Sequence, residues 1–278
     1  MSNKVVSVII ISRRKDALTG LLQDINSQNT SLKTEVITIT DVSPPGKARN
    51  EGAKKANGEI LAFLDGDIRL GNDLYLENLV TALVAAPAPG AVCASLRLPP
   101  QTSAFQKRYA REIAHSETPV VDVMTDVYVV PSACFAMRAE LFTKLGGFNE
   151  LMIRGEDSEL TERIRKAGYR TVLAPKTWCF HPSPDNYWQL ARTNLRNGAG
   201  VAFVDAWYPH LNSDIHPAGI IHYSAPKTRP ERAMRFFQTG FKAISQGKIL
   251  LVSAKIYYSL GYGYGLAKYK VLKQKGRA

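Results

Sequence analysis

Two aspartates separated by one glycine, Asp65-Gly66-Asp67, form the strongest chemical signal in this chain. They directly follow the apolar run 61–64, which is typical of a buried strand that ends at the edge of a sheet. Hard divalent cations prefer carboxylate oxygens, and a cation held in this way often also holds phosphates. An Asp-Gly turn with solvated acids is the alternative interpretation. The motif is short, so its surroundings decide between the two.

Other side chains with chemical potential lie on both sides of this motif. Glu156 and Asp157 open a segment with helical periodicity, where acids in the first turn complement the helix dipole. Arg49 lies in the first turn of another expected helix, where its guanidinium either reaches a phosphate or is solvated. His181 follows an apolar run at the end of an expected strand, where a histidine is usually a hydrogen-bonded structural residue.

The elements that must position these residues alternate along the first half of the chain. Strand patterns occur at residues 5–11, 35–40, 59–64, 91–98, 127–137 and 171–174. Helix patterns occur at residues 16–28, 47–57, 74–85, 139–144 and 156–167, and the polar segment 99–117 is expected to be a loop. Such alternation predicts an α/β fold with a Rossmann-like, mostly parallel sheet covered by helices on both faces. Ligands of these sheets bind beyond the carboxyl ends of strands, which is where Asp65 and Asp67 fall.

The composition is that of a folded protein in a reducing compartment. With 278 residues, 45% of them hydrophobic and 22% charged, the chain can bury a substantial core. The cysteines Cys93, Cys134 and Cys179 lie in apolar stretches without paired spacing, which predicts small buried side chains. The apolar start resembles a weak signal peptide, but basic residues follow where a cleavage site should be, so we expect a first strand and no export.

The net charge of +12 is concentrated at the end of the chain. Residues 226–278 contain twelve basic residues and one acid, Glu231, whereas residues 1–225 are nearly neutral. A nearly neutral body is not the footprint of a protein that binds nucleic acid across its surface. We therefore expect a catalytic body at 1–225 and a basic, helical appendage at 226–278 that suits an anionic surface.

Two apolar segments of this appendage suggest what that surface is. Residues 234–245 place Phe237, Phe241 and Ile244 on one helical face, and residues 249–267 are apolar and rich in tyrosine. Lys255 interrupts the second segment, and a lysine near a bilayer centre costs about 2.5–3.5 kcal/mol. Docking in the interface of an anionic membrane avoids this cost, and we expect peripheral attachment to the cytoplasmic face of the cell membrane. A helical subdomain packed on the body, with solvated lysines, is the alternative.

Two signatures, taken together, resemble the family 2 glycosyltransferases, whose catalytic domain has the GT-A fold. The first consists of residues 45–53 (PGKARNEGA) and 56–67 (ANGEILAFLDGD). The second consists of residues 146–150 (GGFNE), residues 155–160 (GEDSEL) and Arg163 followed by Gly168-Tyr169. Both occur in order and at plausible spacing, and the resemblance covers about residues 4–185. It implies an inverting transferase of the hexosyltransferase class, resembling bacterial enzymes that assemble cell-surface polysaccharides or glycolipids.

The resemblance also implies how the donor side of the site works. The donor is a nucleotide-diphosphate sugar, with a UDP-sugar favoured, and the cofactor is Mn²⁺ or Mg²⁺. A cation at Asp65 and Asp67 would neutralise and orient the departing diphosphate. Asp67 is the implied direct ligand, and Asp65 lies nearer the ribose or the waters of the metal. Asp41 matches an acid that hydrogen-bonds the base, or is a surface turn residue, and Arg49 is favoured as a phosphate contact.

On the acceptor side, the resemblance implies that Asp157 removes the proton of the attacking hydroxyl, with Glu156 beside it. Single displacement then inverts the anomeric carbon, and a lipid-linked glycan is the expected acceptor. The resemblance implies that His181 could complete the cation site as a third ligand. The alternative of a hydrogen-bonded structural histidine stays open. Residues 189–193 (QLART) lack the tryptophan of a motif of processive members, which favours transfer of one sugar.

One departure and two rival functions remain. The family's first strand commonly ends in Pro-Thr-Tyr/Phe-Asn, but this chain has Ser12-Arg13-Arg14-Lys15, which leaves the nucleotide base open. A sugar nucleotidyltransferase shares the sheet and cation chemistry, although its Gly-rich opening loop is missing. A non-catalytic carbohydrate- or nucleotide-binding protein of the same fold is the second rival, and replacement of Asp157 separates it from a catalyst.

Overall fold

The computed structural model describes residues 5–13, 18–113, 117–211 and 229–271. Two compact units are present, and each is described by itself. The first consists of residues 1–97 and 118–182, and the second of residues 98–117 and 183–277. The helix that ends at Trp207 therefore belongs to the same unit as the basic C-terminal helices. The functional division expected at 225 does not follow this structural one and stays a prediction.

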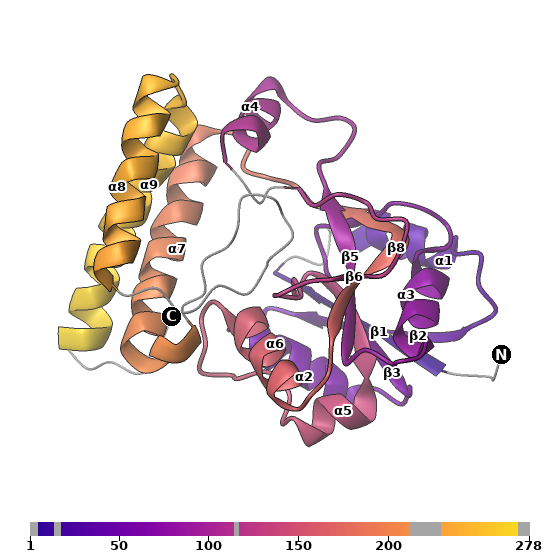
Figure 1. Ribbon diagram of the computed structural model, residues 1–278. Helices are drawn as coiled ribbons and strands as arrows, with labels where there is room; N and C mark the ends of the chain where they lie inside the picture. Colours follow the sequence, from indigo (N-terminus) through magenta and orange to yellow (C-terminus); the bar gives the residue numbers. More distant parts are fainter. Residues whose placement is uncertain (1–4, 14–17, 114–116, 212–228, 272–278) are drawn as a thin grey trace. The chain divides into compact units, whose positions relative to one another are not determined.

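The first unit is built on one sheet (Figure 1). Its strands are β1 (Val5–Ser12), β2 (Lys33–Thr40), β3 (Ile60–Asp65), β4 (Arg69–Leu70), β5 (Ala91–Arg97), β6 (Thr125–Asp126), β7 (Cys134–Arg138) and β8 (Thr171–Phe180). The order is β2-β1-β3-β7-β5-β8-β4, and β6 pairs with β8. The long strands β2, β1 and β3 are parallel to one another, as are β5 and β8, while β7 lies antiparallel between β3 and β5. This confirms the mostly parallel α/β sheet.

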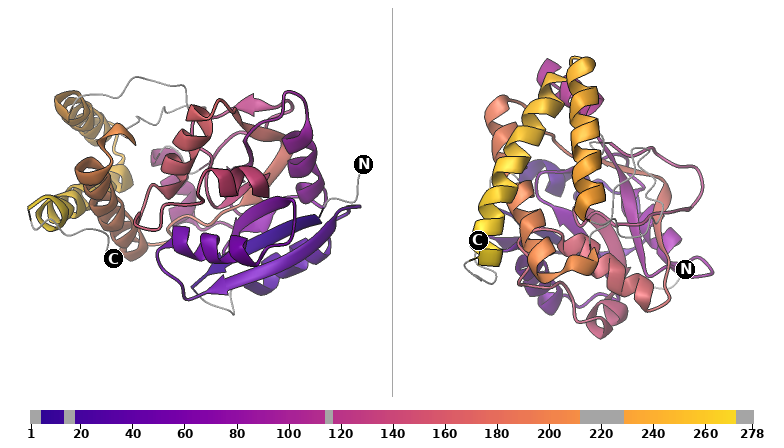
Figure 2. Two further views of the ribbon diagram at one scale, coloured as in Figure 1. Left: turned by 90° about the horizontal axis from the view of Figure 1, so that it is seen from below. Right: turned by 60° about the vertical axis from the view of Figure 1, so that its left-hand side comes forward.

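Helices cover both faces of this sheet (Figures 1 and 2). They are α1 (Thr19–Asn26), α2 (Pro45–Lys55), α3 (Tyr75–Val84), α5 (Ala139–Lys144) and α6 (Glu156–Lys166). Alternate residues of each strand enter two cores, so that Leu64 packs with α1 and α3 while Phe63 packs with α5 and α6. Burial on both faces explains why the strands read as continuous apolar runs. The three cysteines are free and buried, as expected.

Two segments of the first unit differ from the expected strands. The strand expected at 127–137 is limited to β7, because the preceding backbone bonds to other elements. The N–H of Val130 donates to Thr161 Oγ1 of α6 over 3.1 Å, and that of Val127 donates to the Thr171 carbonyl. The strand expected at 171–174 instead continues to Phe180, through a register shift opposite Cys93 and Ser95.

The second unit is helical and contains α4 (Ala104–Glu112), α7 (Tyr187–Trp207), a short 3₁₀ turn (Pro209–Leu211), α8 (Arg229–Ser245), α9 (Ile249–Gly265) and a π-helical turn (Leu266–Val271). The expectation of a loop at 99–117 is wrong over α4. Ser103 and Gln106 form a capping box at its start, and Phe105, Tyr109 and Ile113 pack against α9 at a spacing of four. These signals were present in the sequence, but the polar composition concealed them.

Helices α7 and α9 approach each other unusually closely. A Cβ on Gly198 would overlap the backbone of Tyr258, and a Cβ on Gly261 would overlap the backbone of Leu195. The N-terminus of α9 has no cap of its own, and Glu112 of α4 supplies one by accepting from the N–H groups of Leu250 and Leu251 over 2.7 and 3.2 Å. Among the helices in the described ranges, none combines the length and the apolar character needed to cross a bilayer.

Candidate active site

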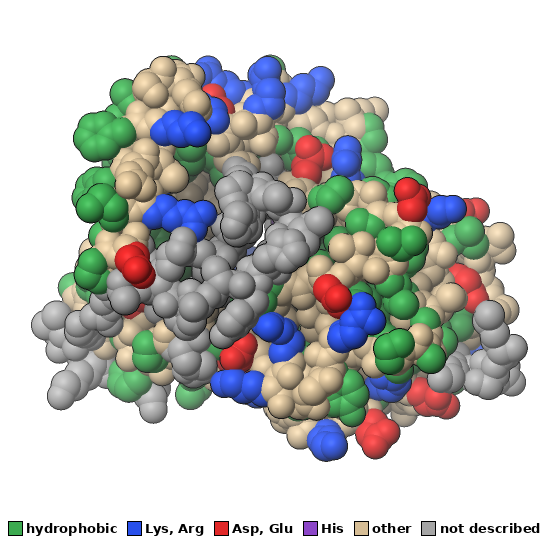
Figure 3. Space-filling model, viewed as in Figure 1, with side chains coloured by type: hydrophobic (Ala, Val, Ile, Leu, Met, Phe, Trp, Pro, Cys, Tyr) green, Lys and Arg blue, Asp and Glu red, His purple; other side chains and the backbone are tan. Residues whose placement is uncertain are grey.

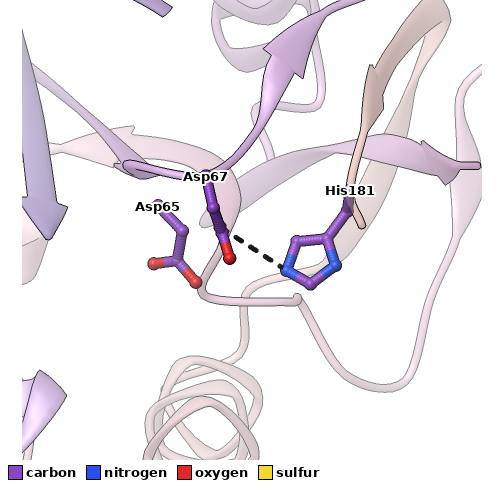
Figure 4. Close-up of side chains that lie close together, drawn as sticks. All are labelled: Asp65, Asp67 and His181. Carbon is purple, nitrogen blue, oxygen red and sulfur yellow. Dashed lines mark ion pairs between the residues drawn. The ribbon is translucent and has the colours of Figure 1, made fainter. Parts of the chain in front are cut away.

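Asp65, Asp67 and His181 meet at one edge of the sheet of the first unit (Figure 4). Asp65 is the last residue of β3 and pairs with Ile11 of β1. The short strand β4 then pairs antiparallel with the end of β8, so that Arg69 lies opposite Phe180. This pairing draws Asp67, which precedes β4, towards His181, which follows β8. The predicted acid pair and the histidine therefore belong to one cluster.

The geometry of this cluster fits a divalent cation. One ligand atom from each side chain lies within 4.8 Å of the other two, and Nε2 of His181 is 3.9 Å from Oδ1 of Asp67. Two carboxylates and an imidazole form a donor set that suits Mn²⁺, whereas Mg²⁺ prefers oxygen alone. Crowding by protein atoms and the charge of Asp65 raise the pKa of Asp67, against the effect of His181, although 60% of the Asp67 side chain is exposed. A cation bound beside Asp67 would favour the charged form of this carboxylate.

Arg49 joins this cluster to a second acid pair, Glu156 and Asp157. Its Nη2 lies 2.6 Å from Oδ1 of Asp65, and its Nη1 lies 3.1 Å from Oε1 of Glu156. The guanidinium is 2% exposed and also lies over the ring of Phe148, at 5.4 Å from the ring centre. The reading of Arg49 as a solvated helix residue is therefore wrong. Its side chain lies inside the protein between two carboxylates, and a direct contact with a phosphate stays a prediction.

The second acid pair lies in the first turn of α6, which begins after Gly155 in a left-handed conformation (φ 81°). Glu156 is buried and also accepts a long hydrogen bond from Ser132 Oγ over 3.4 Å. Asp157 is half-buried, and its Oδ1 accepts from the N–H of Ser158 over 2.8 Å. Burial and the negative charge of Glu156 raise the pKa of Asp157 to about 6. A carboxylate with that pKa is suited to accept a proton near neutral pH.

The loop at the start of the second signature is held by α2 and α6. Asn50 accepts from the N–H of Phe148 over 2.8 Å and donates to the Phe148 carbonyl over 2.8 Å. Gly147 has φ 68°, and any Cβ there would collide with Asn50. Arg163 of α6 binds the carbonyls of Leu145 and Gly147. The residues of the second signature thus fix the entry of the chain into α6, which orients Glu156 and Asp157.

Asp41 directly follows β2, and its N–H donates to the carbonyl of Ser12 over 3.2 Å. Its backbone is in the left-handed region (φ 60°), which an aspartate tolerates better than most residues. It lies at the same sheet edge as Asp65, with β1 between them. The side chain is exposed and stays a candidate for the base contact.

Sequence reasoning missed Ser132 and the role of Asn50. Ser132 precedes β7 in a turn and is 8% exposed, and only the fold brings it to Glu156. Asn50 lies beside Arg49 within the first signature, but the sequence does not show that it spans to the second signature. The available signal was an arginine-asparagine pair in the helix that carries the first signature.

The comparisons with known proteins show the family of this chain. The model of the family described as glycosyltransferase-like family 2 matches residues 2–200. The chain belongs to this family. Two curated relatives are a pre-mycofactocin glycosyltransferase of Mycobacterium tuberculosis, 33% identical over 147 residues, and the O-antigen biosynthesis protein RfbC of Myxococcus xanthus, 31% identical over 197 residues. The matches cover 51% and 62% of this chain but only 30% and 15% of the relatives.

Solved structures confirm the GT-A fold of this family 2 member. The mannosyltransferase PcManGT of Pyrobaculum calidifontis, solved with GDP-Man and Mn²⁺, aligns with a TM-score of 0.58 and 18% identity over 94% of this chain and 86% of its own. GalNAc-T7, solved with UDP, GalNAc and Mn²⁺, aligns with a TM-score of 0.53 and 14% identity over 76% of this chain and 49% of its own.

Proposed function

We propose that this chain is a metal-dependent, inverting glycosyltransferase. It transfers one sugar from a nucleotide-diphosphate sugar to a hydroxyl group by single displacement. The observation that carries this proposal is the bridge formed by Arg49, which holds Asp65 of the cation cluster and Glu156 of the second acid pair on one guanidinium. Since both acid pairs lie this close, a single sugar can reach from one to the other.

Each acidic group has a separate role in the proposed reaction. Asp67 and His181 would bind the cation directly, and Asp65 would orient the donor beside it. A bound Mn²⁺ or Mg²⁺ would act as a Lewis acid that stabilises the charge of the departing diphosphate. Asp157 accepts the proton of the acceptor hydroxyl as the new bond to the anomeric carbon forms, and the electron pair of the old bond leaves with the nucleotide diphosphate. Glu156 holds the acceptor side in place through Arg49 and Ser132.

The donor and acceptor are proposed from chemistry and from the named relatives. A solved neighbour binds GDP-Man and another binds UDP with GalNAc, so a nucleoside diphosphate is the shared part of the donor. We favour a UDP-sugar, contacted through its base by Asp41. The relative named for O-antigen biosynthesis supports a lipid-linked glycan acceptor in the synthesis of a cell-surface polysaccharide or glycolipid.

A thermal-shift screen of nucleotide sugars with and without Mn²⁺ tests the donor half of the proposal. We expect stabilisation by one class of nucleotide sugar that requires the cation, since a ligand that binds only the folded state raises its stability. Stabilisation without any dependence on Mn²⁺ would contradict the cation site.

Asp157→Asn tests the catalytic half, with Ser158→Ala as the control in the same turn. The variant should bind the nucleotide sugar with Mn²⁺ as the parent does but lose turnover by about 10²–10⁴-fold. A parent protein that binds the donor and never turns over would support a non-catalytic binder instead. Formation of a nucleotide sugar from a sugar phosphate would support a nucleotidyltransferase.

A further inference from the structure

Helix α8 exposes a strip of large apolar side chains. Met234, Phe237, Phe241 and Ile244 are 61%, 62%, 73% and 63% exposed. Their spacing of three, four and three residues places them along one face of the helix. Exposed apolar residues scattered singly need no explanation, but a continuous strip of this size marks an interaction surface.

The exposed strip is not the face by which α8 is attached to its unit. Phe236 stacks on Tyr258 of α9 with the ring centres 6.2 Å apart, and Ala243 is buried. The ammonium group of Lys255 lies 4.0 Å from the centre of the Phe236 ring and donates to the Phe236 carbonyl. Because α8 already packs on α9 through these residues, the apolar strip is a second, separate surface of the helix.

Helix α9 carries a matching strip. Ile249, Ile256, Leu260 and Tyr264 are 54%, 55%, 60% and 62% exposed, and their spacing of seven, four and four residues keeps them on one face. The other side of α9, including Leu250, packs against α4 and α7. Figure 3 shows hydrophobic side chains gathered along the edge of this unit that α8 and α9 occupy, with basic side chains among them.

A groove adjoins this surface within the same unit. It has a volume of about 500 Å³ and lies between α7 and α9, lined by Trp188, Arg192, Leu195, Arg196, Gly261 and Tyr264. Arg192 and Arg196 are one helical turn apart, and Tyr264 belongs to both the groove and the α9 strip. The accessible lining of the groove is almost entirely apolar, so Arg192 and Arg196 line it with their aliphatic stems. An exposed tryptophan suits the boundary between headgroups and acyl chains.

We propose that α8 and α9 dock on the surface of an anionic phospholipid bilayer, with the apolar groove in contact with acyl chains at the edge of this surface. Charge selects this occupant over an uncharged apolar partner, because 226–278 carries twelve basic residues and one acid. Basic residues are attracted to an anionic leaflet, and the large apolar side chains of the strips gain free energy when they leave water. The two contributions together suit reversible, peripheral attachment.

Vesicle co-sedimentation of the full chain tests the docking surface. Binding to vesicles of phosphatidylcholine with phosphatidylglycerol should exceed binding to phosphatidylcholine alone by at least tenfold and should weaken with salt. The variant Phe237→Ser/Phe241→Ser should lose most of this binding with an unchanged melting temperature. Val123→Ser is the matched control, since Val123 is 71% exposed on the first unit, and it should bind as the parent does.

Two further measurements test the groove. Arg192→Gln/Arg196→Gln should reduce binding to the anionic vesicles several-fold, and acyl chains brominated near the headgroup should quench the fluorescence of Trp188, with Trp188→Phe as the reference. If brominated acyl chains leave the fluorescence of Trp188 unchanged while the protein is bound to vesicles, the groove does not contact lipid, and its assignment to this surface is overturned.

Other outcomes overturn the docking surface as a whole. If Phe237→Ser/Phe241→Ser binds vesicles as well as the parent, the strip does not contact lipid. If the parent does not bind vesicles and forms a dimer, whereas Phe237→Ser/Phe241→Ser is a monomer, a second copy of the chain covers the strip. Vesicle binding is measured without donor or acceptor, so its failure is distinct from a failure of the proposed transfer reaction.

Discussion

Arg49 and Asp65 form an ion pair of 2.6 Å in which the guanidinium is almost completely buried. The same guanidinium binds Glu156, so one helix residue holds the donor side and the acceptor side of the site together. Burial by itself would lower the pKa of Arg49, but the charges of Asp65 and Glu156 outweigh it and raise that pKa. The arginine therefore remains charged at neutral pH.

Replacement of Arg49 should damage both stability and activity. Arg49→Ala leaves two carboxylates without their partner, and breaking a buried pair in this way costs about 3–5 kcal/mol. Denaturant unfolding should show this loss, whereas Lys47→Ala, an exposed residue in the same helix, should change stability by less than about 0.5 kcal/mol. If the two variants have equal free energies of unfolding, the ion pairs of Arg49 do not stabilise the fold.

Arg49→Lys separates charge from geometry. Lysine keeps the positive charge but cannot bind two carboxylates in a fork. If the variant folds, kcat should fall more than KM rises, since Glu156 and the neighbouring Asp157 lose their fixed orientation. Steady-state kinetics at saturating Mn²⁺ measures this, and a change in KM alone would contradict a positioning role.

The rate should depend on pH through Asp157. Its pKa of about 6 means that the carboxylate, which is the active base, predominates above pH 6 and is lost below it. We expect kcat/KM to fall about tenfold for each pH unit below 6 and to level off above pH 7. A profile measured at saturating cation that stays flat down to pH 5 would exclude Asp157 as the base.

The same carboxyl should weaken the fold when it is ionised. Its pKa is higher in the folded protein than in the unfolded chain, so the folded state binds more protons between about pH 4 and 6. Stability contributed by this group therefore falls as pH rises through that window. A shift of about two pH units corresponds to at most about 3 kcal/mol, and partial exposure of Asp157 reduces it.

Asp157→Asn removes that penalty. At pH 8 the variant should melt at a higher temperature than the parent, and at pH 4 the difference should shrink. Ser158→Ala serves as the neighbouring control. A variant that loses stability equally at both pH values would show that the Asp157 carboxylate makes favourable contacts in the fold.

The cation cluster can be dissected with two variants. Asp67→Asn should weaken Mn²⁺ binding strongly because it removes a charged ligand, and His181→Ala should weaken it less because a water can take the place of the neutral imidazole. Isothermal titration with Mn²⁺ and nucleoside diphosphate measures both, with the exposed Asp73→Asn as control. Unchanged Mn²⁺ affinity in His181→Ala would return His181 to a structural role.

Local patterns were sufficient for most of the fold. The apolar runs of β1 and β3 and the alternation with helices predicted a parallel sheet, because strands buried on both faces need continuous apolar sequence. Asp65 and Asp67 were predicted at the sheet edge because the apolar run of β3 ends directly before them. Helix α4 was missed because its apolar residues are few, and their partner, helix α9, lies far away in the sequence.

Contacts over long sequence distances were decided by the tertiary structure alone. Asp65 and Glu156 lie ninety-one positions apart in the sequence. The periodicity of a single helix or strand cannot predict that Arg49 is buried between them. His181 meets Asp67 only because β4 pairs with the end of β8. The sequence also determined that α8 is amphipathic, but the packing of Phe236 on α9 decided that its apolar strip faces outwards. A helix carries its pattern in its own residues, whereas the direction of each face depends on which neighbours bury it.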